Sequence, residues 1–246
     1  MSEPPVALVT GASGGIGGAC ARVLATDGYA VAVHYHSNEA GAQATVDAIT
    51  AAGGEAWLTP FDAADPQAVD KAIRAIIKER KRLDALVVAA GVVFNQMLAL
   101  TGVDDLDKLW AINLRGAYLA AKAASKQMIR QRSGRIVFLG SIVGERGNAG
   151  QSAYAMTKAG LVGLGKSLAR ELAPRNITVN IVAPGYVETA MTKDLTSAQQ
   201  SAILQQVPLG RAGTPEQIAA LVAFVCSDAA DYITGAVLPV DGGLGT

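Results

Sequence analysis

The chain has 246 residues, of which 50% are hydrophobic and 17% are charged, whereas a disordered chain would need the opposite balance. Its 21 Lys and Arg equal its 21 Asp and Glu, so the basic excess typical of nucleic-acid-binding proteins is missing. No apolar run approaches the about 20 residues of a membrane-spanning helix. We therefore expect a globular protein with neither a nucleic-acid nor a membrane partner.

Short apolar runs alternate with longer helical patterns along the whole chain. In order, the expected elements are strand Val6–Thr10, helix Gly14–Asp27, strand Ala30–Tyr35, helix Glu39–Ala52, strand Ala56–Thr59, helix Pro66–Arg80, strand Ala85–Ala90, helix Leu106–Arg132, strand Arg135–Leu139, helix Ser152–Leu172, strand Ile177–Val182, helix Pro215–Ser227 and strand Ala236–Val240. Strands that lack polar alternation and are joined by helices indicate a parallel sheet covered on both faces. The sequence predicts an α/β protein with a three-layer, doubly wound Rossmann-type fold and a seven-stranded parallel sheet.

The alternation of strands and helices never breaks at a linker, so we expect residues 1–246 to form one dinucleotide-binding and catalytic domain. The polar stretch 189–213, which contains Pro208, is the exception. We interpret it as a substrate-loop insertion, with a mobile connection as the alternative. Cys20 and Cys226 lie far apart and predict buried, inert thiols, with no disulfide framework and no metal site. Reduced thiols and a short start before the first strand favour a cytoplasmic protein.

A glycine-rich turn follows the first predicted strand and opens the first helix. Glycine removes the Cβ atoms that would block a phosphate, and the helix N-terminus offers N–H donors. After the first strand of a parallel sheet, such a turn predicts a dinucleotide site, and a tight structural turn is the weaker alternative. The expected pyrophosphate contacts are Gly11, Ala12, Ser13, Gly14, Gly15, Ile16 and Gly17.

The end of the second strand is expected to lie beside the adenosine ribose. An acidic residue there would favour NAD, but the segment His34–Asn38 holds no carboxylate, and the next one is Glu39. His36, Ser37 or Asn38 can instead donate to a 2′-phosphate, so the sequence favours NADP, with NAD as the alternative. Alternatively, the two histidines of this segment, His34 and His36, are ordinary polar residues at a strand end. Asp62 and Ala63, after the third strand, are expected near the adenine.

Tyr154 and Lys158 are spaced to share one face of a predicted helix. A nearby ammonium group stabilises a phenolate, so we expect Lys158 to lower the pKa of Tyr154. Tyr154 would then protonate the oxygen of a carbonyl that receives a hydride. Ser141, at the end of a strand, is placed to hydrogen-bond the same oxygen, and Asn113 is placed to hold a water that links Lys158 to solvent.

At these residues the sequence resembles the short-chain dehydrogenase/reductase family over nearly its whole length. The resemblance implies that Tyr154 is the acid/base, that Lys158 lowers its pKa and holds the nicotinamide ribose, that Ser141 positions the carbonyl and that Asn113 completes the proton relay. It also implies further contacts to the cofactor from Ala89, Ala90, Gly91, Tyr154, Lys158, Pro184, Gly185, Val187 and Thr189. Ala89 stands where the family usually has Asn, and Gly14 stands where Arg often pairs with the 2′-phosphate.

Within the family, the sequence is most similar to bacterial 3-oxoacyl-(acyl-carrier-protein) reductases. This similarity implies NADPH-dependent reduction of 3-oxoacyl thioesters, docking of an acidic carrier protein at Arg132 and Arg175, and a homotetramer. Small residues on the two helices that hold Asn113 and Tyr154 suit such an assembly, although core packing also explains them: Gly116, Ala117, Ala120, Ala121, Ala124, Ala159, Gly160, Gly163 and Gly165. The alternatives are a reductase of another small carbonyl or alcohol, such as an acyl-CoA, sugar or steroid, and a catalytically silent nucleotide sensor.

Overall fold

The computed structural model describes residues 3–189, 192–193 and 196–246. Its sheet has seven parallel strands in the order β3-β2-β1-β4-β5-β6-β7. The strands are β1 (Val6–Thr10), β2 (Ala30–Tyr35), β3 (Ala56–Pro60), β4 (Ala85–Val88), β5 (Gly134–Leu139), β6 (Ile177–Pro184) and β7 (Val237–Val240). The order reverses between β1 and β4, which opens a crevice at the carboxyl ends of these two strands. The predicted fold class is confirmed.

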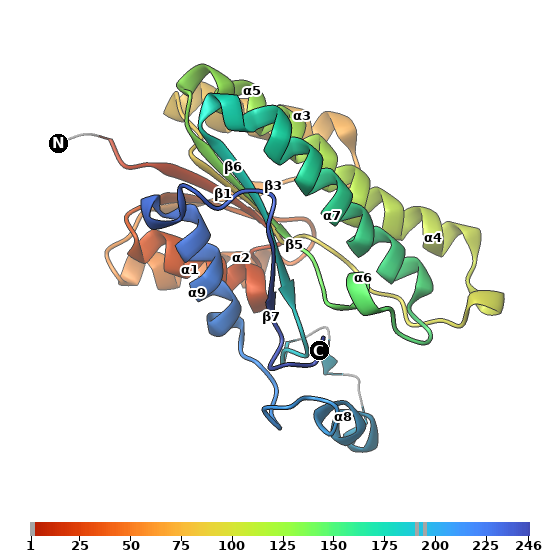
Figure 1. The fold of residues 1–246 in the computed structure, drawn as a ribbon. Helices are drawn as coiled ribbons and strands as arrows, with labels where there is room; N and C mark the ends of the chain where they lie inside the picture. The colour runs from red at the N-terminus through yellow and green to blue at the C-terminus, as the bar shows by residue number, and fades with distance from the viewer. Residues whose placement is uncertain (1–2, 190–191, 194–195) are drawn as a thin grey trace.

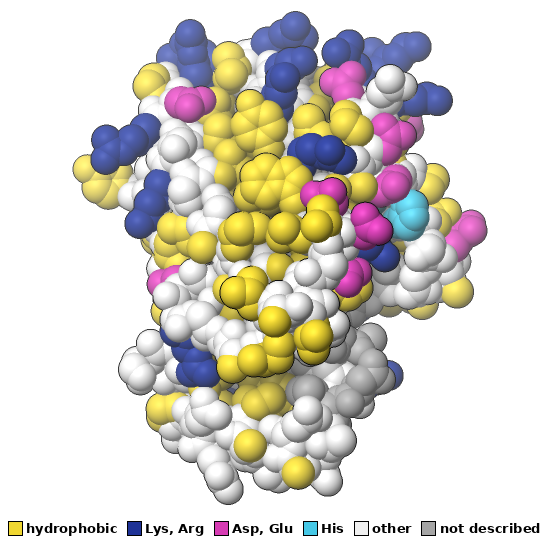
Figure 2. All heavy atoms as spheres, turned by 90° about the vertical axis from the view of Figure 1, so that its right-hand side faces the viewer, with side chains coloured by type: hydrophobic (Ala, Val, Ile, Leu, Met, Phe, Trp, Pro, Cys, Tyr) yellow, Lys and Arg dark blue, Asp and Glu magenta, His cyan; other side chains and the backbone are white. Residues whose placement is uncertain are grey.

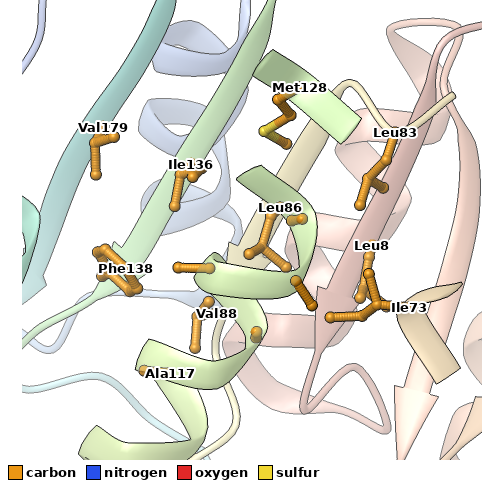
Figure 3. Packing of buried hydrophobic residues seen from close by; sticks show 14 of the residues in the cluster. Leu8, Ile73, Leu83, Leu86, Val88, Ala117, Met128, Ile136, Phe138 and Val179 are labelled. Carbon is orange, nitrogen blue, oxygen red and sulfur yellow. The ribbon is translucent and has the colours of Figure 1, made fainter. Parts of the chain in front are cut away.

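Helices cover both faces of this sheet (Figure 1). One layer holds α1 (Gly15–Thr26), α2 (Glu39–Ala51) and α9 (Pro215–Cys226), and the other holds α3 (Pro66–Arg80), α5 (Gly116–Gln131) and α7 (Ser152–Leu172). Successive side chains of one strand pack against opposite layers. Ile136 and Phe138 of β5 pack on the side of α5, whereas Val137 packs on the side of α1. Figure 3 shows the core between the sheet and the layer of α3, α5 and α7, in which Phe138, Leu86 and Met128 are fully buried. Strands buried on both faces explain why the sequence shows no polar alternation.

The ends of α3 follow directly from its sequence. The carboxylate of Asp65 caps the helix by accepting from the backbone N–H groups of Gln67 and Ala68, and Pro66 occupies the first turn. At the other end, Lys81 adopts a left-handed conformation with φ of 60°, and Lys78 and Arg80 suit the negative end of the helix dipole. The expected boundaries of this helix are confirmed.

The long helix expected over 106–132 is divided. It consists of α4 (Val103–Leu109), a π-helical turn η2 (Trp110–Arg115) and α5, and it ends at Gln131. A π turn holds one residue more than an α turn, so it rotates the side chains that follow. Asn113 lies within this turn and is buried. The apolar periodicity predicted one continuous helix. One extra residue in a single turn changes that periodicity too little to be recognised in the sequence.

The residues that flank and end the stretch 189–213 lie side by side. Val187 and Gly213 form an isolated parallel bridge, and the N–H of Gly213 donates to the carbonyl of Tyr186 at 2.9 Å. Residues 190–191 and 194–195 of this stretch lie outside the described residues. The described part contains helix α8 (Ser197–Leu204), which stands apart from the sheet beyond the end of β7 (Figure 1). Among the described residues, no helix is long and apolar enough to cross a membrane.

Candidate active site

The glycine turn joins β1 to α1 at the carboxyl edge of the sheet. Gly11 has a φ of +66°, and a Cβ atom there would lie 2.8 Å from the backbone of Ala90. Only glycine fits this close approach between the ends of β1 and β4. The hydroxyl of buried Thr10 fixes the same junction, because it accepts from the N–H groups of Ala89 and Ala90 at 3.1 Å each.

The N-terminus of α1 fits an anionic group. Gly14 precedes the helix without a side-chain cap, and the first turn contains no acidic residue. Gly14 and Gly15 are exposed, and a Cβ atom at Gly14 would meet nothing within 4 Å. Backbone N–H groups that lack a cap and carry the positive end of the helix dipole suit a pyrophosphate. The predicted nucleotide turn therefore has the open backbone that a dinucleotide requires.

His34 holds this turn in place, a role that its sequence position did not indicate. Its Nδ1 accepts the N–H of Gly11 at 2.9 Å, so Nε2 carries the proton and donates to the carbonyl of Phe61 at 3.0 Å. The imidazole is 2% exposed, and this burial lowers its pKa to about 4. A neutral imidazole with both nitrogens used is therefore part of the structure of the turn. The continuous apolar run that precedes it marks His34 only as a buried strand residue.

The expected ribose contacts divide into two groups. His36 and Ser37 are exposed and lie where β2 ends, as the sequence predicted. Asn38 instead caps α2 by accepting from Gly41 at 3.1 Å, and it donates to the carbonyl of Ser13 at 3.3 Å. Its side chain is thus already used by the protein. Asp62 lies 3.9 Å from the imidazole of His36, and Ala63 follows it beside the hydrophobic core.

Asn113 is paired with the backbone of the segment after β4. Its amide donates to the carbonyl of Val92 and accepts from the Val92 N–H, both at 2.8 Å, and it also donates to the hydroxyl of Thr157 at 3.3 Å. These bonds tie the π-helical turn to α7 and to the loop at Gly91. Asn113 is therefore placed beside the predicted catalytic residues, with its side-chain amide already bonded to protein groups.

Lys158 and Tyr154 lie on the same face of α7, as their spacing predicted. The ammonium nitrogen of Lys158 donates to the carbonyl of Leu139 at 2.8 Å and lies 5.6 Å from the centre of the Tyr154 ring. A Cβ atom at Gly91 would lie 3.6 Å from the same nitrogen. Lys158 is 7% exposed, and burial lowers its pKa from an ordinary 10.5 to about 8. The ammonium group thus lies between the nucleotide loop, the end of β5 and the tyrosine.

Burial outweighs the expected effect of Lys158 on the pKa of Tyr154. Burial raises the pKa of Tyr154 to about 12, and only a hydrogen bond with Ser141 opposes this increase. Desolvation disfavours the phenolate more strongly than its neighbours favour it. Tyr154 is therefore a protonated phenol at neutral pH. A proton donor must hold its proton, so this state suits the reduction of a carbonyl.

A cavity of about 510 Å³ opens beside these groups. Ser141 and Tyr154 line it, and so do four predicted contacts to the nicotinamide: Pro184, Gly185, Val187 and Thr189. Ile16 brings the nucleotide turn to the same cavity, and Ile203 brings α8 to it. The sequence predicted that the segment after β6 contacts the nicotinamide and that 189–213 is a substrate loop. It missed Arg146 and Gln206, which also line the cavity.

The two arginines expected to dock a partner lie elsewhere. Arg132 follows the C-terminus of α5, and Arg175 ends the short helix η3 (Ala173–Arg175) after α7. Helix α7 has 21 residues and is therefore about 30 Å long, with Tyr154 in its first turn. Both arginines thus lie at the edge of the sheet opposite the cavity. The structure does not bring them together with the catalytic residues within one chain.

The small residues expected at a subunit interface are mostly used inside the chain. Five of them belong to α5 and are buried: Gly116, Ala117, Ala120, Ala121 and Ala124. A Cβ atom at Gly160 would lie 2.6 Å from Leu114, and one at Gly165 would lie 2.5 Å from Ile181. Of this set, only Ala159 and Gly163 are exposed.

Together the nucleotide turn, the buried lysine, the neutral tyrosine and the cavity define an oxidoreductase that uses a nicotinamide cofactor. In the described part of the chain, no cluster of three or more His, Cys, Asp or Glu suits a metal ion. A family model described as enoyl-(acyl carrier protein) reductase matches residues 11–245. The chain belongs to the short-chain dehydrogenase/reductase family.

Curated relatives and solved structures are similar over nearly the full chain. A 3-oxoacyl-(acyl-carrier-protein) reductase from Escherichia coli is 44% identical over 242 residues, which cover 98% of each chain. One from Synechocystis is 43% identical over 240 residues, which cover 97% of this chain and 96% of the relative. A mutant short-chain dehydrogenase/reductase from Serratia marcescens superposes with a TM-score of 0.92 at 39% identity and covers 98% of each chain.

Proposed function

We propose that the protein reduces 3-oxoacyl thioesters, carried on an acyl carrier protein, to 3-hydroxyacyl thioesters with NADPH. The observation that carries this proposal is the placement of Ser141 and the neutral Tyr154 in one cavity with the nucleotide turn. The names of the relatives support the substrate class. We further propose that residues 1–246 act as one dinucleotide-binding and catalytic domain.

The cofactor is proposed to lie across the crevice between β1 and β4. The N–H groups from Gly11 to Gly17 would hold its pyrophosphate, and Asp62 would face the adenine. His36 and Ser37 would donate to a 2′-phosphate, which favours NADPH, although Gly14 leaves NADH as an alternative. Lys158 would hold the nicotinamide ribose near Gly91. Bound there, the reduced nicotinamide supplies the hydride.

The protein's own groups handle the proton. The carbonyl oxygen of the substrate accepts hydrogen bonds from Ser141 and Tyr154, which stabilise the negative charge that grows on it. Tyr154 then gives its proton to that oxygen. Lys158 stabilises the phenolate that remains, because its pKa of about 8 leaves most of it charged at neutral pH. The bonds of Asn113 to Val92 and Thr157 hold the surrounding loop in position.

The direct test is the initial rate of acetoacetyl-thioester reduction with NADPH and with NADH. We expect turnover with NADPH and a lower kcat/KM with NADH. Reduction of simple ketones or sugars with equal kcat/KM would favour the other short-chain reductases. Binding of NADPH without turnover of any carbonyl would favour a nucleotide sensor and contradict the proposal.

We also propose a homotetramer, because large hydrophobic side chains remain exposed on α5, on α7 and at the turn between α4 and α5. Trp110, Tyr118 and Met156 are 46%, 49% and 47% exposed, and Figure 2 shows hydrophobic side chains gathered on this side of the molecule. Large hydrophobic side chains exposed on one face indicate an interface. Light scattering that gives the mass of one chain would contradict this assembly.

Arg132 and Arg175 are proposed to dock the acidic carrier protein. Figure 2 shows Lys and Arg gathered at the upper edge of this face, at the end where α5 and α7 terminate. The length of α7, about 30 Å, separates this docking site from the cavity of the same chain. Replacing both arginines by Glu is expected to raise KM for the carrier-linked substrate and to leave the CoA-linked substrate unchanged. An equal effect on both substrates would contradict the docking role.

A further inference from the structure

Arg146 brings a positive charge into a cavity that is otherwise neutral. It lies at the end of the short helix α6 (Val143–Arg146), five residues after Ser141. Among the described residues that line the cavity, it is the only ionised side chain. The other polar side chains of the wall are neutral hydroxyls and amides, and the amides are Asn95, Asn148, Gln151, Gln199 and Gln206.

The guanidinium group of Arg146 is held in place by neutral partners. One terminal nitrogen donates to the carbonyl of Leu244 at 2.6 Å, and the other donates to the amide oxygen of Gln206 at 3.2 Å. No carboxylate of the described residues lies within 4.0 Å of it. A guanidinium has five N–H donors in a planar fork, so donors and the full charge remain available.

Three amides of the cavity wall are bonded to one another. Gln151 donates to the oxygen of Asn95 at 2.7 Å, and Asn148 donates to the oxygen of Gln151 at 2.9 Å. These bonds hold polar side chains in the wall of the cavity, which suits a ligand that itself carries polar atoms. Arg146 lines the cavity and is exposed to solvent, so its remaining N–H donors can meet an anionic group of a ligand.

We propose that Arg146 binds an oxyanion of the substrate, separate from the ketone that is reduced. The inference rests on the proposed function, since it concerns the same cavity. A carboxylate and a phosphate both match the planar fork of arginine. On a 3-oxoacyl thioester, the oxyanion is either the phosphate of the pantetheine arm or a carboxylate at the far end of the acyl chain.

The test uses three substrates that share one reacting ketone. Acetoacetyl-pantetheine carries no charge, acetoacetyl-4′-phosphopantetheine adds a phosphate, and 3-oxoadipyl-pantetheine adds a carboxylate. For Arg146→Gln, we expect kcat/KM to fall about tenfold or more, mainly through KM, for one of the two charged substrates. The uncharged substrate is expected to stay within about twofold of its native value. The substrate that is affected identifies the oxyanion.

Matched variants separate recognition from a merely structural role. Arg146→Lys keeps the charge and is expected to restore part of the loss. Arg74→Gln removes one exposed positive charge on α3, outside the cavity, and is expected to change nothing. An equal loss on all three substrates, or no loss on any of them, would overturn the proposal, and so would weaker binding of NADPH.

A binding measurement gives the same answer without turnover. Calorimetry with 4′-phosphopantetheine and with adipate is expected to show binding of one of them to the native protein and at least tenfold weaker binding to Arg146→Gln. If the native protein binds neither compound, Arg146 does not recognise an oxyanion. If one compound binds but no thioester is reduced, the proposed reaction fails while the role of Arg146 stands.

Discussion

Replacing Lys158 by Met should stabilise the protein while destroying its activity. Methionine has a similar length and no charge, so it fills the same buried space. The pKa of Lys158 falls from 10.5 to about 8 because burial disfavours the ammonium form. Each pKa unit corresponds to about 1.36 kcal/mol, so the native protein bears about 3 kcal/mol of destabilisation at pH 7. Loss of the hydrogen bond to Leu139 costs about 1 kcal/mol, which leaves a net gain of about 2 kcal/mol.

The pH dependence gives the sharper test. Between pH 8 and 10.5 the unfolded chain holds a proton on Lys158 that the folded protein has released, so the stability of the native protein rises with pH in this window. The variant lacks this rise. Its advantage in urea unfolding at pH 7 should therefore shrink by about 2 kcal/mol at pH 9.5.

Lys166 offers a matched control on the same helix. It is exposed on α7, so Lys166→Met should leave both stability and its pH dependence nearly unchanged. If Lys158→Met is no more stable than the native protein at pH 7, or if its advantage is the same at pH 9.5, burial does not disfavour the ammonium form of Lys158.

Three further variants test the turn and the loop. Gly11→Ala forces a Cβ atom to 2.8 Å from Ala90 at a left-handed φ, so NADPH affinity and melting temperature should both fall; an unchanged Kd in a fluorescence titration would contradict this. Asn113→Leu leaves the N–H and the carbonyl of Val92 unpaired, so urea unfolding should show a free energy of unfolding that is about 2–4 kcal/mol lower. An unchanged free energy of unfolding would show that water replaces the amide. His34, with a pKa of about 4 when folded, must bind a proton on unfolding below pH 6.5, so native stability should fall by up to about 3 kcal/mol between pH 6.5 and 4. His34→Gln should show a smaller fall, and an equal fall would assign it to other groups.

The sequence predicted the sheet and most helices because their signals are local. Asp65 with Pro66 marks the start of α3, and apolar runs such as that of β4 mark buried strands. Helix α8 was missed although Thr196 and Gln199 form a capping box, a signal that sequence reasoning can find.

The parts of the site that depend on the spacing of residues along one element could be predicted from the sequence. The shared face of Tyr154 and Lys158 follows from their separation on one helix. The neutral state of Tyr154 depends on burial by the whole fold, and the contact between His34 and Gly11 joins two strands. The position of Arg146 in the cavity depends on Leu244, nearly a hundred residues away. Such long-range contacts leave no periodic signal.

The central claim is that Tyr154 donates the proton to the substrate oxygen beside a cofactor held by the glycine turn. Stopped-flow measurement of NADPH oxidation by Tyr154→Phe, with saturating acetoacetyl thioester, tests it most directly. We predict a rate at least about a hundredfold below that of the native protein, with the Kd for NADPH within a few-fold of its native value. A native-like rate in this variant would show that Tyr154 is not the proton donor.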